Sequence, residues 1–159
     1  MTVVFQIRPA SSADLNALVD LEFRGFTADR FTRRQFRHLL TRANSTVLVL
    51  EHRRRPVGAA VMLWRRNSTV GRLYDIVVDP QCRGKGFGAR LLRASEVEAK
   101  RHGCVAVSLE VRTDNRSAVA LYHKHGYEIV DSLPGYYEDG ASGLRMAKRL
   151  RKPPARTAS

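Results

Sequence analysis

The chain contains 159 residues, of which 43% are hydrophobic and 27% are charged, and this balance is typical of a single folded domain rather than of a disordered chain. No run of about 18 apolar residues is present, so we expect no membrane-spanning helix and no membrane partner. The first residues lack the basic segment of a secretory signal, and the two cysteines do not make a disulfide framework. We therefore expect a protein of the reducing cytoplasm.

A strong excess of positive charge marks the sequence. It contains 28 lysines and arginines against 15 aspartates and glutamates, which gives a formal net charge of +13. Such a charge favours association with nucleic acid, with a ribosome surface or with a polyphosphorylated cofactor. The alternative is an ordinary solvated surface, which we favour for most of these charges.

The N-terminal half is predicted to contain a strand, two helices and a meander of three strands. β-Branched and aromatic residues indicate a strand at 3–8. Two capping patterns, Ser11–Asp14 and Thr32–Gln35, indicate two helices within the segment 12–43. Short polar turns then separate three strands that form an antiparallel meander: 46–51, 57–64 and 70–78.

The C-terminal half alternates strands and helices after a glycine-rich basic loop at 81–87. The elements expected after this loop are a helix at 88–102, a strand at 104–111, a helix at 115–125, a strand at 127–130 and a strand at 144–150 that closes the sheet. The unit 70–111 then forms a strand–helix–strand crossover. We therefore predict an α/β fold with a mixed, mostly antiparallel sheet and helices on both faces, in one domain over 1–150. The remainder, 151–159, is expected to be a disordered basic tail.

The clearest chemical signal is the segment Arg83–Gly88, which reads Arg-Gly-Lys-Gly-Phe-Gly and lies between a strand and a helix. Alternating glycines let the backbone approach a ligand closely, and the free amides at the start of a helix bind anions. The segment does not complete a dinucleotide fingerprint, because Ala89 stands at the third glycine position, and it lacks the Lys-Ser/Thr pair of a phosphate loop. We interpret it as a pyrophosphate site; the alternative is a basic turn without a ligand.

Several motifs together resemble the GNAT family of N-acetyltransferases. Val78-Asp79-Pro80 followed by Arg83–Gly88 is similar to the acetyl-CoA loop of that family, whose pattern is Arg/Gln-x-x-Gly-x-Gly/Ala. The downstream motifs are similar in order and spacing to the second half of the family: Leu109-Glu110-Val111-Arg112, Asn115 with Ala120-Leu121-Tyr122, and Gly126-Tyr127. The combination is similar to the ribosomal-protein-alanine (RimI-like) branch. The resemblance covers 70–150 closely and 3–69 only in the order of elements.

The resemblance implies acetyl-CoA as the cofactor. We expect no metal, because the one candidate pair, His123 and His125, diverges on a helix. In this family the strand before the loop separates from its neighbour, and the pantetheine arm of the cofactor pairs with its free backbone groups, here Ile76, Val77 and Val78. The loop is expected to hold the pyrophosphate through backbone amides and positive charge: Arg83, Gly84, Lys85, Gly86, Phe87, Gly88 and Ala89. Asn115 corresponds to a residue that contacts the cofactor arm, and the alternative for Asn115 is a helix cap.

Glu110 is the expected general base. It interrupts an otherwise apolar strand, and a buried carboxylate is costly unless it is paired or functional. Burial favours the protonated form and so suits a group that accepts a proton, directly or through water, and the family resemblance implies this role. The alternative is an ion pair with Arg112, which lies on the same face of the strand, or with another neighbour.

Tyr122 is the expected general acid, because Leu121-Tyr122 corresponds to the tyrosine of the family that protonates the departing thiolate of CoA. The pKa of a phenol, about 10, is close to the pKa of a thiol, about 8.5, so a tyrosine hydroxyl can give its proton to a thiolate without a large energetic cost. The alternative is a core tyrosine whose hydroxyl has a partner.

The acceptor is expected to be a primary amine, which must be neutral to attack the thioester. An α-amine with a pKa of about 7.8 is roughly 15% neutral at pH 7, whereas a lysine amine with a pKa of about 10.4 is well below 0.1% neutral. A protein N-terminus is therefore the first choice, as the resemblance implies. Tyr136, Tyr137, Glu138 and Asp139 in the loop 135–143 are candidates for lining the acceptor site; the alternative is a solvent-exposed loop without a role. The alternatives are a small amine, a lysine side chain or, in another functional class, a ribosome- or nucleic-acid-binding module that retains CoA.

Overall fold

The computed structural model describes residues 5–41 and 44–151. The chain forms these elements in order: β1 (Phe5–Pro9), α1 (Leu15–Gly25), α2 (Arg33–Thr41), β2 (Ser45–His52), β3 (Arg55–Leu63), β4 (Val70–Val78), α3 (Phe87–Arg101), β5 (Ala106–Arg112), α4 (Arg116–Lys124), β6 (Glu128–Leu133) and β7 (Gly143–Arg149). The predicted order of strands and helices is confirmed. The beginning of the first expected strand, the end of the segment 12–43 and most of the expected basic tail lie outside the described residues.

Seven strands belong to one sheet, in the order β1-β2-β3-β4-β5-β7-β6. Neighbouring strands are antiparallel except β4 and β5, which run parallel and are connected through α3. The mixed, mostly antiparallel sheet predicted from the sequence is therefore confirmed. The last strand differs from the prediction, because β7 is inserted between β5 and β6 and the edge of the sheet is formed by β6.

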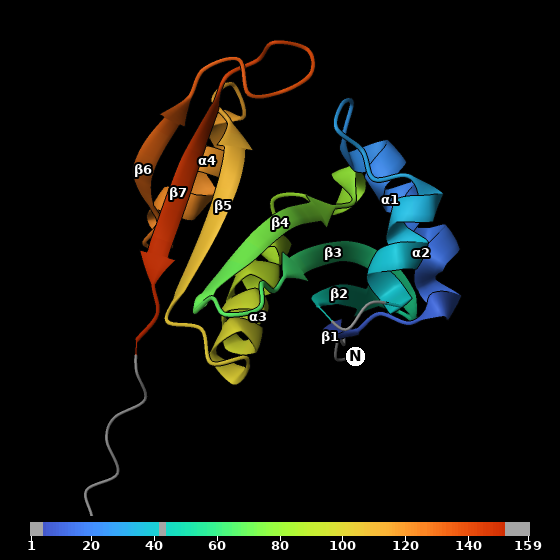
Figure 1. Cartoon of the computed structure of the whole chain (residues 1–159). Helices are drawn as coiled ribbons and strands as arrows, with labels where there is room; N and C mark the ends of the chain where they lie inside the picture. The colour runs from blue at the N-terminus through green and yellow to red at the C-terminus, as the bar shows by residue number, and fades with distance from the viewer. Residues whose placement is uncertain (1–4, 42–43, 152–159) are drawn as a thin grey trace, which may run out of the picture.

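Hydrophobic cores lie on both faces of this sheet. β2 buries four consecutive apolar residues, Val47 to Leu50, because successive side chains of a strand point to opposite faces and both faces are covered. Val47 and Val49 pack in the core beneath α1 and α2, whereas Leu48 and Leu50 pack in the core beneath α3. Helices cover both faces, as predicted (Figure 1). In the described part of the chain, no helix has both the length and the apolar character needed to cross a membrane.

Reciprocal caps fix the start of α2. The backbone amide of Gln35 donates to Thr32 Oγ1 at 3.1 Å, and the amide of Thr32 donates to Gln35 Oε1 at 2.8 Å, which is the capping box that the sequence predicts. At the other predicted capping pattern, Ser11–Asp14, the Ser11 amide donates to Asp14 Oδ2 at 2.8 Å. The loop 26–32 is thereby bounded by two ordered helices, and it forms one wall of the candidate site.

The parallel strands β4 and β5 separate part-way along their length. They are paired from Val70–Ala106 to Leu73–Leu109 and not beyond, whereas β4 stays paired with β3 as far as Val78. At the point of separation Tyr74 is an extra residue in β4, opposite the step between Val61 and Met62 of β3, and such a bulge re-aims a strand. The two halves of the sheet consequently diverge beyond this point (Figure 1), and the backbone of 75–78 faces the gap without a partner strand among the described residues.

Candidate active site

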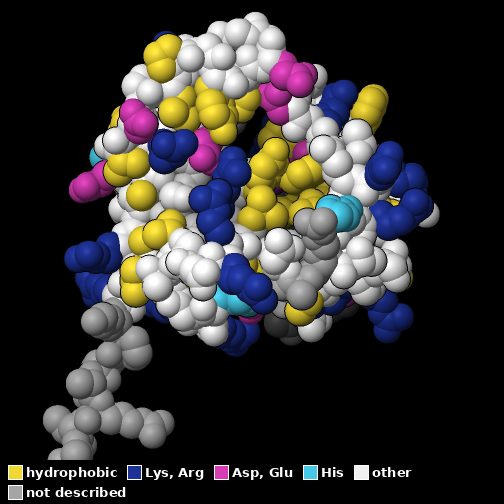
Figure 2. Space-filling view, in the orientation of Figure 1, with side chains coloured by type: hydrophobic (Ala, Val, Ile, Leu, Met, Phe, Trp, Pro, Cys, Tyr) yellow, Lys and Arg dark blue, Asp and Glu magenta, His cyan; other side chains and the backbone are white. Residues whose placement is uncertain are grey.

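A cavity of about 640 Å³ occupies the gap between β4 and β5, a volume within the usual range for small-molecule sites. Its lining combines Asp75 and Ile76 of β4 with Glu110 of β5 and Tyr122 of α4. The loop 26–32 and residues from the β6–β7 connection complete the wall. Figure 2 shows an opening between the two halves of the molecule, with hydrophobic side chains inside it and charged side chains around it. The divergence of the strands therefore brings both predicted catalytic residues to one cavity.

Glu110 lies in the cavity wall as an ion-paired carboxylate. Arg72 Nε of β4 donates to Glu110 Oε2 at 3.0 Å, and Arg145 Nε of β7 lies 3.5 Å from Oε1. The Glu110 side chain is 12% exposed. Of the two interpretations of Glu110, the structure therefore contains the ion pair, although its partners are these two arginines and not Arg112. The two guanidinium groups hold the carboxylate in a fixed position in the cavity wall.

Tyr122 projects from α4 into the same cavity and is otherwise buried. Its ring makes an edge contact with the ring of Tyr127, with 5.8 Å between centroids. Burial raises the pKa of Tyr122, and the negative charge of Asp75 raises it further. The hydroxyl therefore keeps its proton at neutral pH and is available as a donor. No hydrogen-bond partner for it is found within residues 5–41 and 44–151, in contrast to the core-tyrosine interpretation.

The glycine loop before α3 has the backbone geometry of an anion site. Gly84 and Gly86 both have φ of 80°, a conformation that favours glycine, and a Cβ atom at either position would meet no atom within 4 Å. Gly86 is the N-cap of α3 and has no side chain to cap the helix, so the first amides of α3, from Phe87 onward, are free to bind a ligand. These open amides and the unpaired edge of β4 fit the pyrophosphate and pantetheine of acetyl-CoA.

The side chains of this loop are not all available to a ligand. Phe87 is buried and packs against the ring of Phe5, with centroids 4.6 Å apart, so only its backbone remains for binding. Arg83 Nη2 donates to the carbonyl of Gly25 at 3.0 Å, which connects the loop to the end of α1. Lys85 is exposed and offers its charge to solvent.

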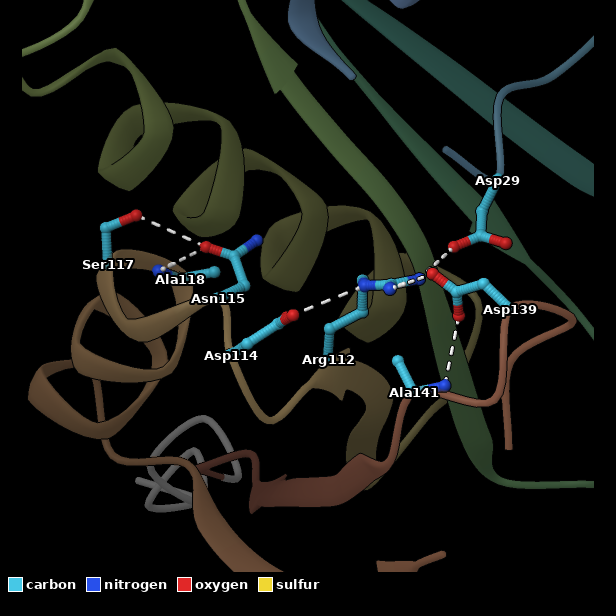
Figure 3. A network of polar contacts seen from close by, with 8 residues as sticks. All are labelled: Asp29, Arg112, Asp114, Asn115, Ser117, Ala118, Asp139 and Ala141. Atoms are coloured by element: carbon cyan, nitrogen blue, oxygen red, sulfur yellow. Dashed lines mark hydrogen bonds and ion pairs between the residues drawn. The ribbon is translucent and has the colours of Figure 1, made fainter. Parts of the chain in front are cut away.

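Asn115 is the N-cap of α4. Its side-chain oxygen accepts from the amide of Ala118 at 3.3 Å, so the helix-cap interpretation is found in the structure. Asn115 also lines the cavity, and its amide group points toward the helix start rather than toward the ion pairs of Arg112 (Figure 3). The cap orients α4 and thereby positions Tyr122, which α4 carries.

An unpredicted network around Arg112 joins three segments at the rim of the cavity (Figure 3). Arg112 Nη1 donates to Asp29 Oδ2 of the α1–α2 loop at 2.8 Å, and Arg112 Nη2 donates to Asp139 Oδ2 of the β6–β7 connection. The guanidinium also lies over the ring of Tyr137, 4.9 Å from its centroid. Arg112 holds the pKa of Asp139 below its usual value by this hydrogen bond. The sequence motif contained Arg112, but its partners come from loops that only the fold brings together.

Aromatic side chains form much of the remaining rim. Phe31 stacks on Tyr74, with centroids 4.8 Å apart, and Tyr136 makes an edge contact with Tyr137 at 5.1 Å. Tyr136 and Tyr137 belong to the loop 135–143, which was a candidate for the acceptor site from the sequence. No sequence motif indicated Tyr74. All four side chains line the cavity, so part of its rim is aromatic.

Residues 14–127, which include the glycine loop, Glu110 and Tyr122, match the sequence pattern of the acetyltransferase (GNAT) family. The chain belongs to the GNAT family. This membership confirms the predicted family, the fold and the enzyme class, an N-acetyltransferase that depends on acetyl-CoA. Which amine the enzyme acetylates does not follow from membership.

Individual GNAT proteins are similar to this chain over different lengths. An uncharacterized N-acetyltransferase of Methanocaldococcus jannaschii is 30% identical over 92% of this chain and 67% of that protein. The N-alpha-acetyltransferase RimI of Mycobacterium tuberculosis is 42% identical over 48% of this chain and 47% of RimI, so the matched segment spans about half the length of that relative. The crystal structure of Ard1 from Thermoplasma volcanium superposes with a TM-score of 0.87 at 27% identity, over 94% of this chain and 100% of that chain.

Proposed function

We propose that this GNAT enzyme transfers the acetyl group of acetyl-CoA to the N-terminal α-amine of a protein. The observation that carries the proposal is the single cavity at the separation of β4 and β5, which has Glu110 and Tyr122 in its wall and an aromatic mouth formed by two loops. An open mouth suits the end of a polypeptide chain. The similarity to an N-alpha-acetyltransferase of Mycobacterium tuberculosis supports the same acceptor.

Acetyl-CoA supplies the acetyl thioester and is proposed to lie along the free edge of β4. The backbone groups of Ile76, Val77 and Val78 face the gap and are proposed to pair with the pantetheine arm. The loop amides of 84–89, together with the charges of Arg83 and Lys85, are proposed to hold the pyrophosphate. Asn115 is proposed to support this arm while it caps α4.

Two side chains are proposed to move protons. Glu110 accepts a proton from the acceptor nitrogen, directly or through a water molecule, and its ion pairs with Arg72 and Arg145 fix its position. Tyr122 is proposed to donate its hydroxyl proton to the departing sulfur; burial raises its pKa, so the hydroxyl still carries its proton when acetyl-CoA binds. The rest of the rate enhancement comes from holding the amine beside the thioester carbon.

A thiol-release assay with acetyl-CoA tests the acceptor. The panel contains peptides with a free N-terminus, the same peptides with a blocked N-terminus and an internal lysine, and polyamines. We expect thiol release with the free N-terminus at least tenfold faster than with either other class. Faster release with blocked lysine peptides or with polyamines would replace the proposed acceptor with that class.

The exposed arginines of α2 favour a second, non-catalytic role. Arg33, Arg34 and Arg37 lie together on the outer side of this helix, and they suit an acidic partner such as a ribosome surface or a nucleic acid. The test is binding to RNA over a range of salt concentrations. Binding that weakens steeply with salt and disappears when the three arginines become glutamine supports this role, whereas an unchanged affinity contradicts it.

A further inference from the structure

The end of α1 lies directly against the strand that is proposed to hold acetyl-CoA (Figure 1). Gly25 is the last residue of α1, and a Cβ atom on it would lie 2.2 Å from Cγ2 of Val77 in β4. Glycine is therefore required for this close approach. The side chain of Val77 packs in the core beneath α1 and α2, whereas its backbone belongs to the free edge of β4. Because packed interiors transmit small displacements, a shift of this edge also shifts the end of α1.

Two arginines cross this junction in opposite directions. Arg24 Nη1 of α1 donates to Oδ2 of Asp79, the residue after β4, at 2.5 Å. Arg83 Nη2 of the glycine loop donates to the carbonyl of Gly25 at 3.0 Å. The second contact satisfies a carbonyl group that the end of a helix leaves without an intrahelical partner, and positive charge is favoured there. The two contacts therefore tie α1 to both ends of the segment 79–83.

Asp79 also shapes the entry to the glycine loop. Its Oδ1 accepts from the amide of Gln81 at 3.0 Å and so caps the short turn 80–82, while its own amide donates to the carbonyl of Val57 in β3 at 2.8 Å. Asp79 is buried, and a buried carboxylate is costly unless it is paired and hydrogen-bonded. Arg24 supplies the pairing charge from α1. One carboxylate thus contacts both the entry to the loop and the end of α1.

The acceptor wall begins at the same junction. The loop 26–32 follows Gly25 directly and lines the cavity. Its chain is held to the end of α1 by Arg30, which donates to the carbonyl of Phe26 at 2.5 Å and to the carbonyl of Phe23 at 3.0 Å. The wall of the cavity and the glycine loop are therefore anchored at one place in the fold.

We propose that Arg24 and Arg83 are positioning residues that couple the cofactor site to the acceptor wall. This inference rests on the proposed function and deepens it. A pyrophosphate that orders the glycine loop also orders the end of α1 through Arg24 and Arg83, so the acceptor binds to a wall whose ordering has already occurred. Arg83 keeps further N–H donors for the pyrophosphate and can contact the cofactor and α1 together.

Isothermal titration calorimetry with CoA tests the coupling, because CoA occupies the cofactor site without a reactive acetyl group. The Kd of a peptide with a free N-terminus is measured with and without saturating CoA. We expect CoA to lower the peptide Kd of wild type by about fivefold to tenfold, and the peptide to lower the Kd of CoA by the same factor. In Arg24→Gln both factors should fall close to one, while the Kd of CoA alone stays nearly the same.

Two variants of α1 separate this role from a loss of charge or of stability. Asp20→Asn removes the other ion pair of Arg24, an exposed one within α1, and should keep the full coupling factor. Arg24→Lys keeps a positive charge beside Asp79 and should restore most of the factor that Arg24→Gln loses. A coupling factor that is unchanged in Arg24→Gln would overturn the inference and leave the proposed function intact.

Two variants of the glycine loop separate cofactor binding from coupling. Arg83→Gln removes the contact to Gly25, whereas Lys85→Gln removes an exposed charge that makes no hydrogen bond or ion pair with α1 among the described residues. Both variants should weaken the binding of CoA, but only Arg83→Gln should reduce the coupling factor. Equal reductions in the two variants would contradict the role of Arg83.

Amide hydrogen exchange of the full chain tests the coupling even if no peptide binds. Adding CoA to wild type should slow exchange in the glycine loop and in the loop 26–32, whereas in Arg24→Gln the slower exchange should be confined to the glycine loop. Failure of CoA to protect the glycine loop would contradict the proposed cofactor site. Protection of the glycine loop alone in wild type, or equal protection of 26–32 in wild type and Arg24→Gln, would overturn the coupling.

Discussion

Arg112 Nη1 lies 2.8 Å from Asp29 Oδ2, and this contact ties the end of β5 to the loop between α1 and α2 at the cavity rim. The same guanidinium reaches Asp139 beyond β6, so one side chain links two loops that form the mouth. A network of this kind is worth more than an isolated surface ion pair. Arg112 therefore ties together the two loops that carry Phe31, Tyr136 and Tyr137 of the aromatic rim.

Arg112→Gln should loosen both loops. We expect the KM for the acceptor peptide to rise about fivefold to twentyfold, with a smaller change in kcat and no change in the Kd for acetyl-CoA. The matched control is Arg101→Gln, which breaks an exposed Arg101–Glu98 ion pair on α3 and should leave both constants unchanged. Steady-state kinetics with the peptide varied provides the measurement. An unchanged acceptor KM would show that the network does not shape the mouth.

Gly86→Ala should weaken acetyl-CoA binding. Alanine at a φ of 80° is strained by about 1–2 kcal/mol, and the strain falls on the loop whose amides are proposed to hold the pyrophosphate. Gly103→Ala is the matched control, because Gly103 has φ of 76° and equally open surroundings at the end of α3.

Both glycine variants should lose similar stability in thermal denaturation. Only Gly86→Ala should raise the Kd for acetyl-CoA, by about tenfold, in isothermal titration calorimetry. Equal affinities in the two variants would remove the loop from the proposed binding site.

Tyr122→Phe should lower kcat by about a hundredfold, because it removes one proton donor from the reacting atoms, while the Kd for acetyl-CoA stays the same. Tyr127→Phe is the control at a neighbouring buried tyrosine. The Tyr127 hydroxyl donates to Glu96 at 2.8 Å. Removing this hydroxyl should lower the free energy of unfolding by about 1 kcal/mol without changing kcat. Full turnover in Tyr122→Phe would refute the proposed acid.

Asp14 should make a pH-dependent contribution to stability. Hydrogen bonds from Arg8 hold the pKa of Asp14 below its usual value, through contacts of 2.8 Å to both carboxylate oxygens. A lowered pKa in the folded state contributes stability above the unfolded pKa of about 3.9, and the contribution is lost as pH falls through the lower, folded pKa.

Asp14→Asn should therefore be less stable than wild type by about 1–3 kcal/mol at pH 7. The asparagine side chain keeps an oxygen that can accept from the Ser11 amide. The loss of unfolding free energy therefore measures the Arg8–Asp14 ion pair. The difference should shrink toward zero in denaturant titrations at the lowest pH at which both proteins fold. A constant difference across pH would contradict the lowered pKa.

The sequence predicted the elements well because their signals are local. The Thr32–Gln35 capping box and the glycine loop before α3 depend on neighbouring residues, and both have the expected geometry. The family resemblance led us to expect that β4 and β5 separate before Ile76. Their pairing does end before that residue, at Leu73 and Leu109. The position of β7 inside the sheet was missed, because strand order is a long-range property.

The environment of the site depended on contacts that no local pattern encodes. Glu110 meets Arg145 because these residues are directly opposite each other in the β5–β7 register, and it meets Arg72 beside the last paired residues of β4 and β5. Arg112 is two residues away from Glu110 on the same face, yet it turns to Asp29 and Asp139 at the rim. The sequence alone therefore singled out the Glu110 carboxylate but not the arginines that contact it.

The proposed α-amine acceptor is tested most directly by mass spectrometry of one peptide that offers both a free α-amine and an internal lysine. The peptide is incubated with the full chain and acetyl-CoA at pH 7, and fragmentation locates the acetyl group. We predict one acetyl group on the α-amine, with its formation lost in Tyr122→Phe and retained in Tyr127→Phe. Acetylation of the lysine alone, or equal formation in both tyrosine variants, would contradict the central claim.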